Sequence, residues 1–214
     1  MRNSILALIL SLASQAAMAQ FGVAWTRSPT VTVVANGDDP RIALVHEAVA
    51  FWNTTLEQLD SPFRIGAVTR VDLPIPEEAL QTVSDTILGS FGRNRPAAPA
   101  SLRAVPGDLT IFLAHSGFVS FAGPFDGDGR RVVGIRGLTH PPLTLPNVPR
   151  NVIAHEIGHA IGLGHNADPR LLMCGRPASC RPAEFRSDVP RMFPLADAEK
   201  QELLRLYPAN WKPH

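Results

Sequence analysis

The chain has 214 residues, a formal net charge of +1, 45% hydrophobic residues and 18% charged residues. A chain of this length is expected to form one folded domain, and its balance of apolar and charged residues excludes wholesale disorder. The near-zero net charge provides no electrostatic basis for binding nucleic acid or an anionic membrane, so we expect neither partner.

The first 19 residues have the pattern of a secretory signal peptide. Arg2 is followed by an apolar run from Ile5 to Ala13, and positions 17–19 read Ala-Met-Ala, the form of a cleavage site. The apolar run is too short to cross a bilayer, so no membrane anchor is expected. We therefore predict a mature chain of residues 20–214 that is one domain and is secreted, either out of the cell or into a periplasm.

The first half of the mature chain alternates strand and helix patterns. Ser28–Ala35 is rich in β-branched residues and predicts a strand. Arg41–Leu59 has apolar residues three or four apart, which predicts a helix. Phe63–Leu73 predicts a second strand, and Pro76–Leu88 a short helix that begins with proline and glutamate. The Gly- and Pro-rich stretch Gly89–Pro106 predicts an exposed loop.

The second half continues with a buried strand at Leu109–Leu113, which is a continuous apolar run. Gly123–Gly129 predicts a turn. Arg131–Arg136 predicts a strand at the edge of a sheet, because glycine and arginine flank it. Gly137–Pro149 holds four prolines and predicts a loop. Two helices are expected in the rest of the chain: about Pro149–Leu163 and about Leu195–Tyr207.

The sequence HEIGHAIGLGH carries the chemistry of the chain. His155 and His159 are four residues apart, so a helix presents both imidazoles on one face and both can reach one ion. Glu156 points beside such an ion, where it can hold a water molecule. Gly162 can adopt positive φ and reverse the chain, which brings back His165 as a third ligand. Three histidines leave one position of a zinc ion for water, as in catalytic sites.

A short HExxH sequence alone also occurs in helices by chance. The glycine and the third histidine at fixed spacing make a zinc site the favoured interpretation. The remaining histidines lack such spacing, and we expect them to be surface or hydrogen-bonded residues: His46, His115, His140 and His214.

This extended motif is the signature of the metzincin metallopeptidases. Met173 follows His165 by eight residues, a spacing similar to that of the matrixin (matrix metalloproteinase-like) branch, which has a methionine in a tight turn beneath the zinc. The resemblance implies an α+β fold of the metzincin zincin type, with a twisted mixed sheet of about four to five strands and three main helices. Four further segments resemble matrixins: Ala48–Asn53, GDLTIF, GPFDGDG and PLADAEKQELLRLYP.

The resemblance also implies a secreted zinc endopeptidase acting on protein or peptide substrates, expected to be a monomer. One catalytic zinc would be held by the three histidines of the motif, with Glu156 as general base and Met173 as a packing floor. The substrate would lie as an added strand beside Arg131–Arg136. Asn151 would line the main specificity pocket, although a surface amide is the alternative. The strand residues expected to contact substrate are Val133, Gly134 and Ile135.

Other positions depart from the matrixin pattern. Matrixins carry a prodomain whose cysteine blocks the zinc, whereas the first predicted strand here begins soon after the predicted cleavage site, so we predict residues 20–214 to be a single catalytic domain without a prodomain. Matrixins hold a second, structural zinc before the FDG turn, but the matching positions here are Val119 and Phe121, with Gly134 where a further histidine would fall. We therefore predict no structural zinc. Asp126 and Asp128 offer carboxylates for calcium, but acidic residues in turns usually only form the turn.

The two cysteines, Cys174 and Cys180, are predicted to form one disulfide that closes a short loop, as expected of an exported protein. A two-cysteine metal site is the alternative, and it lacks histidine partners at the spacing of a zinc finger. Directly after the methionine turn, the bridge would either stiffen the wall of the substrate pocket or have no effect on specificity.

Two other functions compete with the endopeptidase. One is a catalytically inactive binding module on a metzincin scaffold, which the intact Glu156 and three histidines argue against. The other is a zinc hydrolase of non-peptide amides, which the sequence leaves open.

Overall fold

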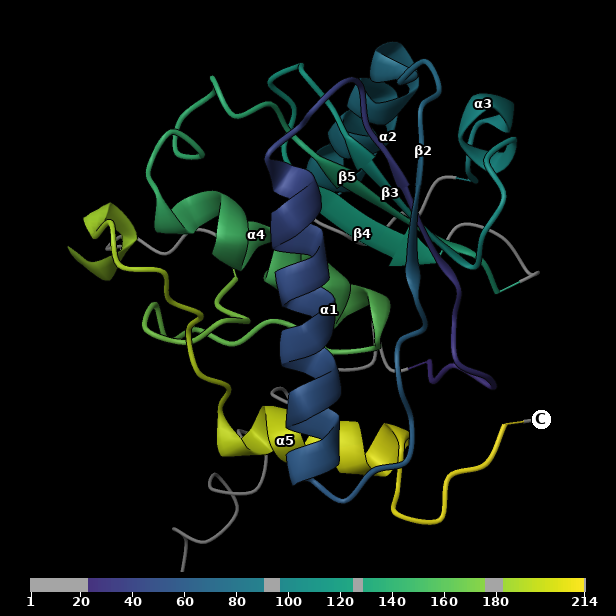
Figure 1. Cartoon of the computed structure of the whole chain (residues 1–214), viewed down its shortest axis with the longest axis vertical. Helices are drawn as coiled ribbons and strands as arrows, with labels where there is room; N and C mark the ends of the chain where they lie inside the picture. Colours follow the sequence, from purple (N-terminus) through teal and green to yellow (C-terminus); the bar gives the residue numbers. More distant parts are fainter. Residues whose placement is uncertain (1–22, 91–96, 125–128, 176–182, 214) are drawn as a thin grey trace, which may run out of the picture.

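The computed structural model describes residues 23–90, 97–124, 129–175 and 183–213. Its centre is one five-stranded mixed sheet in the order β2-β1-β3-β5-β4 (Figure 1). Four strands run parallel, and β4 pairs antiparallel with β5 at one edge. The predicted α+β fold with a sheet of four to five strands is confirmed. The strands are β1 (Val31–Val34), β2 (Val68–Val71), β3 (Leu109–Leu113), β4 (Phe121–Pro124) and β5 (Arg131–Ile135).

Helices cover both faces of this sheet. The larger core joins α1 and α4 to one face, with Trp52 and Ile157 fully buried against Ile111 of β3. In Figure 1, α5 crosses the lower end of α1. The smaller core joins α2 and α3 to the opposite face, where Leu80 packs with Phe112. The helices are α1 (Arg41–Gln58), α2 (Glu77–Gly89), α3 (Ala100–Arg103), α4 (Asn147–Ala160), the 3₁₀ turn η2 (Ala183–Arg186) and α5 (Asp197–Leu206).

Several predicted boundaries differ from the structure. The strand expected at Phe63–Leu73 is confined to β2, and the zinc-motif helix begins at Asn147 and ends at Ala160. The helix α3 lies within the stretch predicted to be all loop. The strand β4 was not predicted, because its second half belongs to the Gly- and Pro-rich sequence expected to be a turn.

The prediction that Arg131–Arg136 forms an edge strand is wrong. The strand β5 lies between β3 and β4 and is paired on both sides. The Arg131 side chain does not point into solvent. Its guanidinium lies 4.3 Å from the centre of the Trp25 ring and donates to the carbonyls of Ala160 and Val23. A long arginine side chain can be buried in this way when its donors find partners.

The chain before β1 is fastened to α4 and α5. The Trp25 indole donates to the Ala160 carbonyl at 2.8 Å, and the Trp25 amide donates to the Tyr207 hydroxyl. That hydroxyl donates in turn to the Ile161 carbonyl at 2.8 Å. The Tyr207 ring stacks on Phe63 with their centres 3.9 Å apart. Burial raises the pKa of Tyr207 to about 12.

This shift predicts how stability depends on alkaline pH. The folded state favours the neutral phenol, so the stability that Tyr207 contributes is complete below its ordinary pKa of 10.0 and is lost as pH rises toward about 12. Because Tyr207 is the only tyrosine of the chain, the ultraviolet absorbance of tyrosinate reports it directly. The native protein should titrate near 12 and the denatured chain near 10. A native midpoint near 10 would contradict the buried, bonded hydroxyl.

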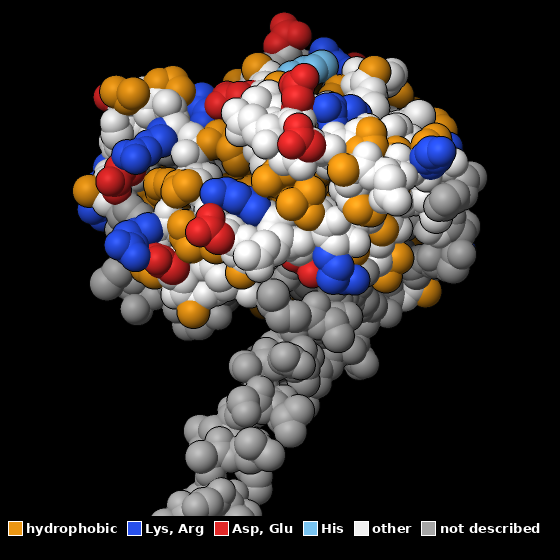
Figure 2. All heavy atoms as spheres, turned by 90° about the horizontal axis from the view of Figure 1, so that it is seen from below, with side chains coloured by type: hydrophobic (Ala, Val, Ile, Leu, Met, Phe, Trp, Pro, Cys, Tyr) orange, Lys and Arg blue, Asp and Glu red, His pale blue; other side chains and the backbone are white. Residues whose placement is uncertain are grey.

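Charged side chains of both signs share one face of the molecule. Figure 2 shows basic and acidic side chains interspersed on the face seen from below, so that face has no extended field of one sign. Among the described residues, no helix has the length and apolar character needed to cross a membrane.

Candidate metal centre

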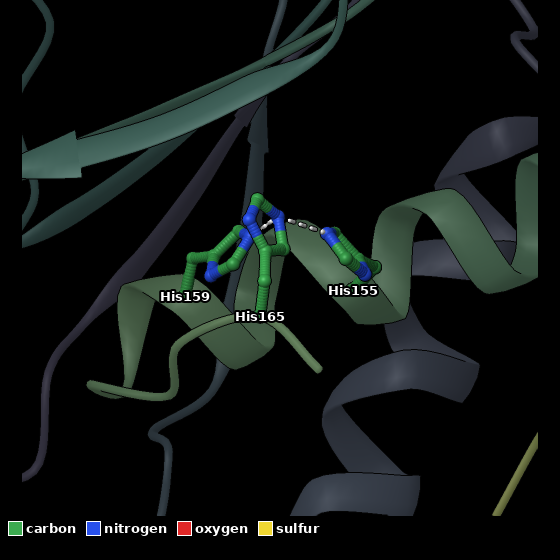
Figure 3. A group of neighbouring side chains, drawn as sticks. All are labelled: His155, His159 and His165. Carbon is green, nitrogen blue, oxygen red and sulfur yellow. Dashed lines mark hydrogen bonds between the residues drawn. The ribbon is translucent and has the colours of Figure 1, made fainter. Parts of the chain in front are cut away.

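The helix α4 presents the first two histidines, and a glycine turns the chain back with the third. His155 and His159 lie one turn apart in α4. Gly162 has φ of +108°, a conformation that side chains rarely adopt, so its predicted role in reversing the chain is confirmed. Its amide donates to the His159 carbonyl at 3.0 Å, and the reversal brings His165 to the same place (Figure 3).

The three imidazoles converge through their Nε2 atoms. The Nε2 of His165 lies 3.3 Å from that of His155 and 2.9 Å from that of His159. Nitrogens that bind one zinc ion tetrahedrally at about 2.0–2.1 Å lie about 3.3 Å apart, so the spacing fits zinc. The Nδ1 of His155 lies 2.7 Å from the Leu172 carbonyl, and that of His159 lies 2.8 Å from the Leu163 carbonyl. Since a carbonyl only accepts, both Nδ1 atoms are the donors and both Nε2 lone pairs are left for a metal.

Among the residues that the structure describes, these histidines are the one group of three or more possible ligands close enough to share an ion. Three imidazoles that leave one coordination position open are the ligand set of catalytic zinc. The group can therefore bind a metal, and its donor set suits zinc.

Glu156 lies next to His155 and is largely shielded from solvent. It follows His155 in α4, and only 7% of its surface is exposed. Burial reduces the dielectric screening of a carboxylate, so its interaction with nearby charges is strong.

The segment after His165 is tied to α5. The Asn166 side chain donates to the carboxylate of Glu199, which also accepts from the Ala196 amide at 2.7 Å. Burial raises the pKa of Glu199 above its ordinary value, and the two hydrogen bonds oppose that shift. The Asn166 amide donates to the Met173 carbonyl at 2.8 Å, so the His165 loop and the methionine turn are joined directly.

Met173 is fully buried against α4. A Cβ added to Gly158 would lie 2.6 Å from the Met173 Sδ and 2.8 Å from Trp52 Cζ2. The close approach of Met173 to the helix therefore requires glycine one residue before His159. The thioether packs against α4 on the side that carries Gly158.

Gly158→Ala should lower the free energy of unfolding by about 1–3 kcal/mol, the usual cost of overpacking a filled core. Denaturant unfolding measures this effect. Gly89→Ala is the matched control, because a Cβ there meets nothing within 4 Å. The control should change stability by no more than about 1 kcal/mol, in the stabilising direction. Equal effects of the two substitutions would refute the close packing of Met173.

The prediction that a substrate adds as a strand beside β5 is wrong, because β5 is paired with a strand on each side. Val133, Gly134 and Ile135 pair with β3 on one side, and Val133 and Gly134 also pair with β4 on the other. Val133 and Gly134 are therefore paired within the sheet on both sides. The outer edge belongs to β4, the last strand in the sheet order.

Asn151 has a different role from the pocket-lining one that we predicted. It is 4% exposed, and its Nδ2 donates to the carbonyls of Asn147 and Arg191, both at 2.8 Å. Its Oδ1 accepts from the Phe193 amide at 2.8 Å. Asn151 thus fastens the chain before α5 to α4, a contact 42 residues away in sequence that no local pattern indicates.

Phe121 and Gly134, two of the positions that match a structural zinc site, lie against each other. Phe121 lies across from Gly134 in the sheet, and a Cβ on Gly134 would meet the Phe121 ring at 2.6 Å.

The loop before β4 is bound by α2. The Ser84 hydroxyl of α2 donates to the Val119 carbonyl and accepts from the Val119 amide. Glu77 of α2 accepts from the amides of residues 115 and 116. Helix α2 therefore holds the loop before β4, a role that sequence reasoning missed.

Some predicted features fall outside the described residues. These are the signal peptide at residues 1–19, the acidic pair Asp126 and Asp128, and Cys180. Cys174 itself is described and lies buried directly after Met173.

The sequence was also compared with those of known proteins. Part of the chain is similar to a matrix metalloproteinase. Matrix metalloproteinase-16 of Homo sapiens and that of Mus musculus are each 42% identical over 83 residues, and Matrix metalloproteinase-16 of Rattus norvegicus is equally similar. The match covers 31% of this chain and spans only 14% of the length of each relative. No family model matches the chain. The findings thus support a matrixin-like relationship for part of the chain.

Proposed function

We propose that this chain is a zinc-dependent endopeptidase that hydrolyses peptide bonds in protein substrates. The observation that carries the proposal is the convergence of three histidine Nε2 atoms beside the buried Glu156. The partial similarity to Matrix metalloproteinase-16 supports the same function.

In this proposal, side chains of the protein bind the zinc ion and transfer the proton of the attacking water. When bound, zinc lowers the pKa of a coordinated water and polarises the scissile carbonyl. His155, His159 and His165 would hold the ion, two of them oriented by the carbonyls of Leu172 and Leu163. Glu156 would accept the proton of the attacking water and deliver it to the leaving amine.

The substrate would add to the sheet at β4. This strand is at the edge of the sheet, and α4 packs against it, so a peptide along β4 would lie close to the helix that carries the ligands. Main-chain hydrogen bonds to an edge strand are a common way to hold an extended peptide. This replaces β5 as the proposed contact.

We further infer that residues 1–19 direct export and that the mature, monomeric protein acts outside the cell or in a periplasm, with a Cys174–Cys180 disulfide. Mass spectrometry of the exported protein tests both features. The first residue should be Gln20, and the two cysteine peptides should appear linked before reduction.

A peptide library tests the proposed activity. The zinc-loaded protein and its Glu156→Ala variant are incubated with peptides derived from a proteome, and new termini are identified. Cleavage by the wild type alone supports the endopeptidase. Zinc bound by both without any cleavage would favour an inactive binding module or a hydrolase of non-peptide amides.

A further inference from the structure

Four polar side chains follow one another along α4 at intervals of four residues: Asn147, Asn151, His155 and His159. Residues so spaced lie on one face of a helix. The two histidines carry the metal centre. The two asparagines are 1% and 4% exposed, and a buried amide is retained only where it has hydrogen-bond partners.

Both asparagines bind main-chain groups of residues 184–193, in addition to the bond from Asn151 to the Asn147 carbonyl and the bond from the Arg150 side chain to Asn147. Asn147 Oδ1 accepts from the Arg191 amide at 3.0 Å, and Asn151 Nδ2 donates to the Arg191 carbonyl at 2.8 Å. Asn151 Oδ1 also accepts from the Phe193 amide. The helix therefore holds this segment through successive backbone groups, much as a neighbouring strand would. Asn147 Nδ2 lies within 3.0 Å of three more carbonyl oxygens, those of Glu184, Ser187 and Val189.

The held segment reaches a zinc ligand by two further hydrogen bonds. Pro194, the residue after Phe193, accepts through its carbonyl from the Leu172 amide at 2.9 Å. The Leu172 carbonyl accepts from His155 Nδ1 at 2.7 Å. A continuous path thus runs from Asn151 through Phe193, Pro194 and Leu172 to His155.

We propose that Asn151, supported by Asn147, is a positioning residue for the metal ligand His155. Asn151 fixes the segment that fixes Leu172, and the Leu172 carbonyl sets the orientation of the imidazole. The inference rests on the zinc site of the proposed function. Loss of groups that orient a metal ligand typically weakens metal binding by 10–100-fold, and we expect about tenfold for Asn151→Ala because it acts through intervening residues.

The test measures zinc affinity of the full chain by competition with a chelator, and the visible absorption of the cobalt-substituted protein. Asn151→Ala should bind zinc about tenfold more weakly and shift the cobalt spectrum. Asn147→Ala, which leaves the Phe193 bond in place, should have a smaller effect in the same direction. If Asn151→Ala does not fold, Asn147→Ala decides.

Asn53→Ala is the matched control. Asn53 of α1 donates to the Ile65 carbonyl at 3.0 Å and accepts from the Ile65 amide at 2.8 Å, so it fastens a different segment by the same kind of bonds. The control should lower thermal stability and leave the zinc affinity and cobalt spectrum unchanged.

Two results would overturn the inference: wild-type zinc affinity and spectrum in both α4 asparagine variants, or equal weakening by Asn53→Ala. Either leaves the endopeptidase intact if the wild type binds zinc and cleaves peptides. A wild type that binds no zinc would instead remove the proposed function itself.

Discussion

Replacing Glu156 by glutamine should leave zinc bound and lower kcat/KM for peptide hydrolysis by about 10²–10⁴-fold, the usual contribution of a general base. Glutamine has nearly the same shape as glutamate, so the buried position beside His155 stays filled. Its amide oxygen is far too weak a base to take a proton from water. Steady-state kinetics on a peptide found by library cleavage, together with the zinc content of each sample, measures the effect.

Glu47→Gln is the control for that substitution. Glu47 accepts from Arg150 of α4 at 2.6 Å, so it contacts the same helix without belonging to the metal centre. Its removal should leave kcat/KM near the wild-type value. Wild-type activity in Glu156→Gln would show that another group carries the proton, and loss of zinc from that variant would assign Glu156 a structural role.

Replacing Arg41 by methionine should lower the free energy of unfolding by about 3–5 kcal/mol, the cost of breaking a buried ion pair. The side chains of Arg41 and Asp39 are 2% and 5% exposed, and their closest atoms lie 2.6 Å apart. Arg41 also donates to the carbonyls of Leu113, Ile135 and Arg136 at the ends of β3 and β5. The substitution would leave a buried carboxylate and three carbonyls without this donor. Denaturant unfolding measures the loss.

Arg70→Met provides the comparison. The Arg70 side chain is 37% exposed, and it lies 4.0 Å from the carboxylates of Asp38 and Asp72. Ion pairs of this exposed kind contribute about 1 kcal/mol or less. Equal losses from Arg41→Met and Arg70→Met would mean that the buried pair does not anchor the start of α1 to the sheet.

The metal centre is the part of the molecule that could be predicted from the sequence. Its geometry depends on local rules: helical spacing aligns His155 with His159, and the positive φ of Gly162 returns the chain to His165. Burial of the apolar run Leu109–Leu113 in the sheet followed from the same kind of local pattern.

Features that depend on contacts between distant segments could not be predicted in this way. The strand β4 contains Gly123 and Pro124, residues typical of turns, and it is defined only by its pairing with β5. Arg131 was interpreted as a mark of an exposed edge, whereas Trp25 and two distant carbonyls make its burial favourable. The partners of Asn151 are likewise visible only once residues 191–193 are placed beside α4.

We propose that three histidines hold one zinc ion and that peptide hydrolysis needs this ion. The most direct measurement is a titration of metal-free protein with zinc, in which the rate of peptide cleavage is followed against zinc bound per chain. Cleavage should rise in proportion to bound zinc and reach its plateau at one ion per chain. Cleavage that is independent of zinc, or a full complement of zinc without cleavage, would show that the protein is not a zinc-dependent endopeptidase.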